Sequence, residues 1–303
     1  MSFWRLEHQL LGDPINREIW VRSPLIQTAI QPPRAGTGDD VGALQALVGP
    51  DALPWVPDLV GRRWKEEQSL FIVGSAYAAF AEPWAGRERS MSESEFRSPG
   101  SAADFQRVFF DRVVEGDPNY YEPIAELAMD LGSSEKVALL DLCRASFVHL
   151  EGTYSASCTE RTLLDNWELF ARYVVANDDW TWRRLLISQT RRIVALGALA
   201  ERGFLAFFHR RGAAIHRSDS GEAWKPPRRN DGWVRPTSRQ RKLDSWVDPD
   251  QGQSWWVVRA RDPNGLAREW RLLPVRHPSW RNAGIDPMYI YARRVLRTML
   301  DAE

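Results

Sequence analysis

Polar stretches follow four apolar runs of the chain, and these stretches carry the side chains best suited to chemistry. The runs span 69–73, 137–142, 192–196 and 271–275. Gly74 ends the first run, Asp141 lies near the end of the second, Gly197 follows the third and His277 follows the fourth. In open α/β sheets, ligands bind beyond the carboxyl ends of the strands. If the runs are strands of one sheet, we expect these residues to share a binding site.

The most distinctive of these stretches follows the fourth run and reads LPVRHPSWRN, from Leu273 to Asn282. His277, Pro278 and Ser279 stand immediately after the predicted strand and before a helical pattern at 286–300. Because proline fixes its backbone angle, this combination predicts a compact, preset loop that presents a histidine and a hydroxyl. A loop that only caps a helix and packs is the alternative.

Helical patterns alternate with the four predicted strands. They lie at 102–114, 160–175, 198–209 and 286–300, and a helical lead-in occupies 1–30. Repeated strand–loop–helix units predict an α/β fold: a three-layer sandwich with a central, mostly parallel sheet flanked by helices. We interpret residues 1–303 as a single domain.

The segment 210–265 interrupts this alternation and is predicted to be an excursion rich in turn residues and tryptophan. From Lys225 to Lys242 it carries seven cations against the single acid Asp231. Basic residues interleaved with aromatic ones are typical of nucleic-acid contacts, although a solvated loop is the alternative. The expected phosphate contacts are Arg228, Arg229, Arg239 and Arg241.

Composition restricts the setting rather than the chemistry. Forty basic residues balance forty acidic ones, so the total charge favours neither a nucleic-acid partner nor an acidic one. The two cysteines, Cys143 and Cys158, are too few for a metal centre of their own and favour a reducing cytoplasm. No apolar run is long enough to span a membrane, and no export signal is evident.

Three motifs in order resemble the uracil-DNA glycosylase superfamily. They are FIVGSAY at 71–77, VALG at 194–197 and HPS at 277–279, within a resemblance that covers roughly residues 65–300. The resemblance implies the glycosylase-like fold and hydrolysis of an N-glycosidic bond in DNA without a metal or other cofactor. It implies DNA as the partner, and no obligate protein partner.

The resemblance assigns roles to the last loop. His277 would stabilise the negative charge that develops on the departing base. Ser279 would hold a phosphate beside the extruded nucleotide, and Trp280 or Arg281 would fill the space left in the base stack, with Asn282 as a further DNA contact.

The first loop departs from the family pattern. Uracil-cleaving members place Asp or Asn two residues after the glycine to orient water, whereas this chain has Ala76 there. Asp104 is the first candidate to replace that carboxylate, and Glu82 and Glu95 are the alternatives.

The expected base pocket is therefore unusual. Its predicted residues are Gly74, Ser75, Ala76, Tyr77, Phe80, Asp141 and Arg144. Small side chains in the first loop leave volume, and Asp141 stands where the family often has asparagine, so a bulky modified pyrimidine is favoured over uracil. Such an enzyme would serve in DNA repair or in defence against phage DNA.

Two other functions remain open from the sequence. The missing carboxylate at Ala76 suits a non-catalytic nucleic-acid-binding relative of the same fold. A nucleotide-binding enzyme with a doubly wound sheet is the third interpretation. Metal-dependent and acyl-transfer mechanisms are disfavoured, because no metal-ligand spacing, glycine-rich phosphate loop or nucleophile elbow is present.

Overall fold

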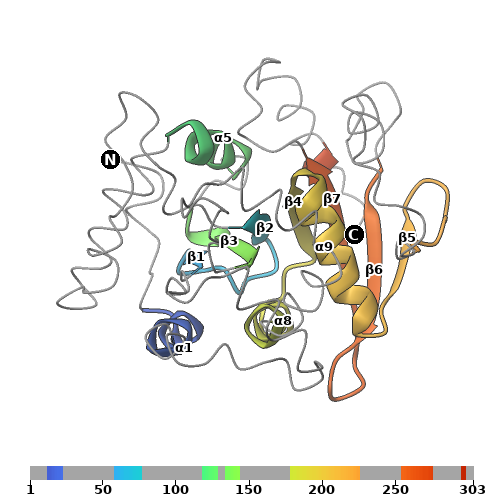
Figure 1. Ribbon diagram of the computed structural model, residues 1–303, viewed down its shortest axis with the longest axis horizontal. Helices are drawn as coiled ribbons and strands as arrows, with labels where there is room; N and C mark the ends of the chain where they lie inside the picture. The colour runs from blue at the N-terminus through green and yellow to red at the C-terminus, as the bar shows by residue number, and fades with distance from the viewer. Residues whose placement is uncertain are drawn as a thin grey trace, which may run out of the picture.

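A computed structural model describes seven stretches of the chain: residues 12–22, 58–76, 118–128, 134–143, 178–225, 254–275 and 295–297. Seven strands in these stretches form one sheet in the order β1-β3-β2-β4-β7-β6-β5. The strands are β1 (Leu59–Val60), β2 (Leu70–Ala76), β3 (Val137–Cys143), β4 (Arg192–Leu196), β5 (Ala214–Arg217), β6 (Trp256–Arg261) and β7 (Ala267–Val275). The helices are α1 (Pro14–Arg22), α5 (Pro118–Ala128), α8 (Asp178–Ile187) and α9 (Gly197–Arg210), and a 3-10 turn η4 (Ser134–Lys136) precedes β3. Figure 1 shows their arrangement.

All four predicted strands are present, and they form the parallel centre of the sheet. β3, β2, β4 and β7 pair side by side in parallel. The prediction of a mostly parallel sheet is nevertheless only half right, because β1 pairs antiparallel with β3, and β7, β6 and β5 pair antiparallel in succession. The fold is α/β with a mixed sheet.

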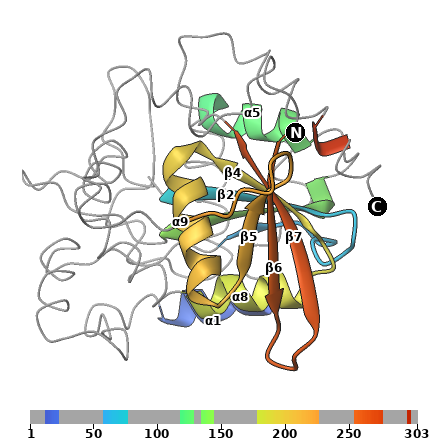
Figure 2. The ribbon, with the colours of Figure 1, turned by 90° about the vertical axis from the view of Figure 1, so that its right-hand side faces the viewer.

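Apolar side chains explain why the central strands lie inside. Phe71, Val73, Ile193 and Ala195 alternate along β2 and β4 and are fully buried on one face of the sheet. Ile72 and the other intervening residues are equally buried, which is typical of a parallel sheet that is covered on both faces. Figure 2 shows α1 and α8 on one side of the strands and α5 on the opposite side.

Helix α9 supplies much of the aromatic core. Its start after β4 is made possible by Gly197, whose φ of 85° lies in the left-handed region. Phe204, Phe207 and Phe208 recur at helical spacing and are buried against the sheet. The ring centroids of Phe208 and Trp270 on β7 lie 5.2 Å apart, so packing of the helix fixes the middle of β7.

Part of the predicted excursion belongs to the sheet. β5 and β6 both lie between 210 and 265, and β6 continues into β7 through a hairpin turn at 262–266. The Asp262 carboxylate accepts hydrogen bonds from the backbone N–H groups of Asn264 and Leu266, both at 2.9 Å, and Gly265 adopts a φ of 80°. The turn residues that predicted irregular structure therefore close a β-hairpin.

The predicted helices have different outcomes. The predicted helix at 198–209 is confirmed as α9, and helices are also present within the predicted stretches 1–30 and 286–300, at 14–22 and 295–297. The predicted helices at 102–114 and 160–175 lie outside the described residues. Within the described stretches, no helix has the length and apolar character needed to cross a membrane.

Candidate functional site

The carboxyl ends of the four parallel strands lie next to one another. In register, Leu140 of β3 is the partner of Val73, Val73 is the partner of Ala195, and Ala195 is the partner of Pro274 on β7. This row crosses all four strands one position before Gly74 and Val275. Neighbouring strands lie about 4.8 Å apart, so the row measures about 14 Å. The segments that continue from these strands therefore start within the width of one nucleotide-sized ligand.

Asp141 is the predicted site residue that the structure describes most fully. It is half-buried on β3, and its register partner on β2 is Gly74. Side chains of register partners project from the same face of a sheet. Because the partner of Asp141 is a glycine, no side chain from that position of β2 lies beside the carboxylate. The carboxylate and the glycine, predicted separately from the sequence, are thus neighbours at the carboxyl edge.

The first predicted loop begins inside the sheet. Ser75 and Ala76 are still part of β2, and Ala76 pairs with Cys143 in the last register position of the β2–β3 ladder. The predicted loop at 74–79 is therefore strand up to Ala76.

The other predicted site residues lie outside the described stretches. They are His277, Asp104, Glu82, Glu95, Tyr77, Phe80, Arg144, Ser279, Trp280, Arg281, Asn282, Arg228, Arg229, Arg239 and Arg241. The structure thus brings together Gly74, Asp141 and the strand ends after which Tyr77 and His277 follow in the sequence.

Two tryptophans of the predicted excursion are half-buried and have structural partners. The indole N–H of Trp256 donates a 2.7 Å hydrogen bond to the buried carboxylate of Glu201 on α9. The ring of Trp224 lies 5.4 Å from that of His209, edge to face. These two rings therefore help to attach β6 and the segment that follows β5 to α9.

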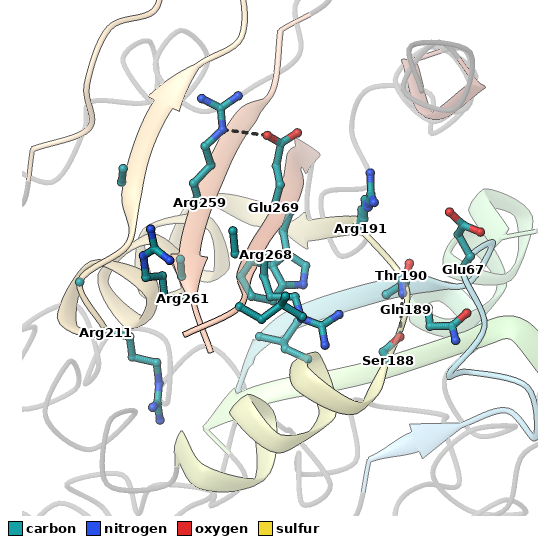
Figure 3. A pocket seen from close by; sticks show the side chains of 17 residues that line it. Glu67, Ser188, Gln189, Thr190, Arg191, Arg211, Arg259, Arg261, Arg268 and Glu269 are labelled. Atoms are coloured by element: carbon teal, nitrogen blue, oxygen red, sulfur yellow. Dashed lines mark hydrogen bonds and ion pairs between the residues drawn. The ribbon is translucent and has the colours of Figure 1, made fainter. Parts of the chain in front are cut away.

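The sequence interpretation missed a second feature, which lies at the amino-terminal ends of β4 and β7. A hollow of about 950 Å³ lies among the end of α8, the link to β4, the α9–β5 connection and the β6–β7 hairpin (Figure 3). Its described lining includes five arginines: Arg191, Arg211, Arg259, Arg261 and Arg268. The alternating VVRAR of β6 was the available signal, since alternate residues of a strand share one face.

Metal-ligating side chains are not grouped in the described part of the chain: no cluster of three or more histidine, cysteine, aspartate or glutamate residues there could hold a metal ion.

Comparisons with known proteins add no relative. No protein-family model matches the chain, and no curated protein matches it significantly.

Proposed function

We propose that the protein is a DNA glycosylase that flips a modified base out of DNA and hydrolyses its N-glycosidic bond. The observation that supports this most strongly is the side-by-side position of the ends of β3, β2, β4 and β7. The three motifs of the resemblance continue from adjacent strands, β2, β4 and β7, as one shared active site requires. Had these strands been separated in the sheet, the motifs could not have acted together.

Asp141 favours a particular class of base. A carboxylate only accepts hydrogen bonds, and the amino group of cytosine is a donor, whereas uracil presents an oxygen acceptor at the same position. At the edge beside Gly74, Asp141 suits a cytosine-type base. In this proposal a bulky substituent on the base uses space left by the small side chains of the first loop.

His277 would act on the leaving group. Its chain continues from Val275, the end of the strand paired with β4. A hydrogen bond to the departing base contributes most when negative charge has developed there, so His277 is expected to affect the rate more than DNA binding. Asp104 is the proposed water-activating carboxylate.

The proposal is tested by incubating the purified protein with duplexes that carry cytosine, uracil, hydroxymethylcytosine or glucosylated hydroxymethylcytosine. Abasic sites are detected by strand cleavage in alkali. We expect cleavage at the bulky cytosine derivative, little cleavage at uracil, and a loss of about 10²–10³ in rate in His277→Ala. Absence of abasic sites with every duplex, while duplex binding persists, would support the non-catalytic nucleic-acid-binding alternative instead.

Asp141→Asn provides the test of base selection. Asparagine has almost the shape of aspartate but can also donate, so the variant should lose discrimination against uracil-type bases. Asp104→Asn should lower the rate on every substrate equally. Equal selectivity in wild type and Asp141→Asn would remove Asp141 from the base contact.

A further inference from the structure

The hollow at the amino-terminal ends of β4 and β7 is separate from the proposed base-excision site. Glu269 of β7 lines the hollow, and Val275 ends the same strand six residues later. At about 3.3 Å per residue, the two positions lie about 20 Å apart. A ligand in the hollow would therefore not occupy the carboxyl edge.

The lining is strongly cationic for a protein with no net charge. Five arginines and two glutamates, Glu67 and Glu269, are among the described lining residues. Figure 3 shows Arg211 and Arg261 at one side of the hollow and Arg191 at the other. The excess of positive charge in a concave site attracts anions.

The two carboxylates do not neutralise this excess. Glu269 receives a 2.8 Å ion pair from Arg259, whose side chain remains 61% exposed. The guanidinium of Arg261 donates to the backbone oxygen of Gly265 at 2.8 Å, which leaves its other N–H groups for a ligand. Arg268 forms a longer ion pair of 3.8 Å with Asp262, so its charge is partly compensated.

The walls of the hollow are held by the backbone. On the side of the α8–β4 link, the N–H of Gln189 donates to the carbonyl of Lys65 at 2.8 Å, and the N–H of Arg271 donates to the carbonyl of Arg191 at 2.7 Å. On the other side, β6 and β7 are paired from Trp256 to Arg261. A site with fixed walls loses less conformational entropy on binding.

We infer that this hollow binds a small phosphate-bearing ligand of nucleotide size. Arginine forks match the geometry of phosphate oxygens, and Arg261 and Arg191 stand on opposite sides of the hollow, as more than one phosphate group would require. The guanidinium of Arg211 instead packs over the ring of Trp182, 4.6 Å from its centroid. A volume of about 950 Å³ is within the range of small-molecule sites. The exposed side chain of Leu266 gives the hollow an apolar surface for the uncharged part of the ligand.

The test is calorimetric titration of the full chain with ATP in the absence of magnesium, and with adenosine as the uncharged control. We expect saturable binding of ATP only. The double variant Arg259→Gln with Arg261→Gln should weaken it roughly tenfold, since one exposed charge contact changes affinity about two- to fivefold. Arg17→Gln on α1, which is exposed and does not line the hollow, should bind like wild type.

Glu269→Gln distinguishes a binding role from a structural one. It breaks the same ion pair as Arg259→Gln but raises the positive charge, so ATP should bind about two- to fivefold more tightly. Equal ATP affinity in wild type and both sets of variants would overturn the inference. The inference would also be overturned if ATP did not bind and the variants weakened only the binding of duplex DNA. Base excision by the same variants is measured in parallel and separates this site from the proposed catalytic one.

Discussion

Replacement of Arg184 tests how the N-terminal helix is attached to the sheet. This arginine on α8 is completely buried, and it lies between two buried carboxylates. Its Nε atom lies 2.9 Å from Asp58, one Nη atom lies 2.9 Å from Asp13, and the same Nη donates to the side-chain oxygen of Asn16 at 2.7 Å. One guanidinium therefore joins α8 to α1 and to the segment that leads into β1.

The expected cost of Arg184→Met follows from these contacts. Removing one partner of a buried ion pair typically costs about 3–5 kcal/mol, because the remaining charge stays buried without compensation. Here two carboxylates lose their cation, so we expect the free energy of unfolding to fall by at least about 3 kcal/mol. Tryptophan fluorescence during urea unfolding measures this change, since Trp64 and Trp182 are buried in the core.

The neighbouring residue is a matched control. Arg183 is on the same helix and pairs with Glu18, but both side chains of that pair are more than 40% exposed. Arg183→Met should therefore cost less than about 1 kcal/mol. A loss for Arg184→Met within about 1 kcal/mol of that for Arg183→Met would refute the reasoning. Changing Asp13 and Asp58 to asparagine in the Arg184→Met background should restore part of the loss.

The pH dependence of the free energy of unfolding gives an independent test of the role of Arg184. Burial disfavours ionisation of Asp13, but the charge of Arg184 and hydrogen bonds from Arg184, Asn16 and Ile15 hold its pKa below the ordinary value of an aspartate. A lowered pKa stabilises the folded state above the unfolded pKa and loses that contribution as pH falls through the folded pKa. Wild type should thus lose stability below about pH 4. In Arg184→Met the charge and the hydrogen bond of Arg184 are lost, while burial and the backbone hydrogen bonds from Asn16 and Ile15 remain, so the difference in stability from wild type should shrink between pH 7 and pH 4.

Three further predictions concern other parts of the chain. Trp256→Phe removes the donor to the buried Glu201 and should lower the free energy of unfolding by about 1–3 kcal/mol in urea titrations, whereas a neutral effect would argue against attachment of β6 to α9 by this bond. Leucine at Ala76 and Ala78 should suppress excision of the bulky base in the abasic-site assay while uracil cleavage stays unchanged, and equal suppression of both would contradict the enlarged pocket. Four arginines of the basic run are neutralised together: Arg228, Arg229, Arg239 and Arg241. For duplex DNA, the slope of the logarithm of the binding constant against the logarithm of the salt concentration should then fall in magnitude by up to about 4, and an unchanged slope would remove these residues from the interface.

The parallel centre of the sheet was predictable because its strands are continuous apolar runs. Strands buried on both faces leave a signal at every residue, as in the LFIV of β2 and the RIVAL of β4. β6 has a weaker signal, since Arg259 and Arg261 interrupt its apolar residues. β1 has only two residues, too few for any periodicity.

The order of the strands was not predictable from the runs themselves. The sequence of β4 alone does not determine that this strand lies between β2 and β7. That position depends on long-range packing, such as the contact of Phe208 with Trp270, and on connections whose length permits several arrangements. The cationic hollow was missed for the same reason: its arginines come from segments between 191 and 268, and only the fold brings them together.

β7 is a single strand that extends from one proposed site to the other. Towards β4 it is parallel, so its carboxyl end, two residues before His277 in the sequence, lies beside the ends of the other central strands. Towards β6 it is antiparallel, so its amino end belongs to a short hairpin that carries Arg268 and Glu269. Between these ends, Trp270 and Leu272 are buried against α9. A rigid core between two polar ends keeps the sites at a fixed separation, so ligand binding at one end is expected to leave the geometry of the other unchanged. A rate of base excision that does not change when ATP saturates the hollow would agree with this arrangement, and a change in that rate would contradict it.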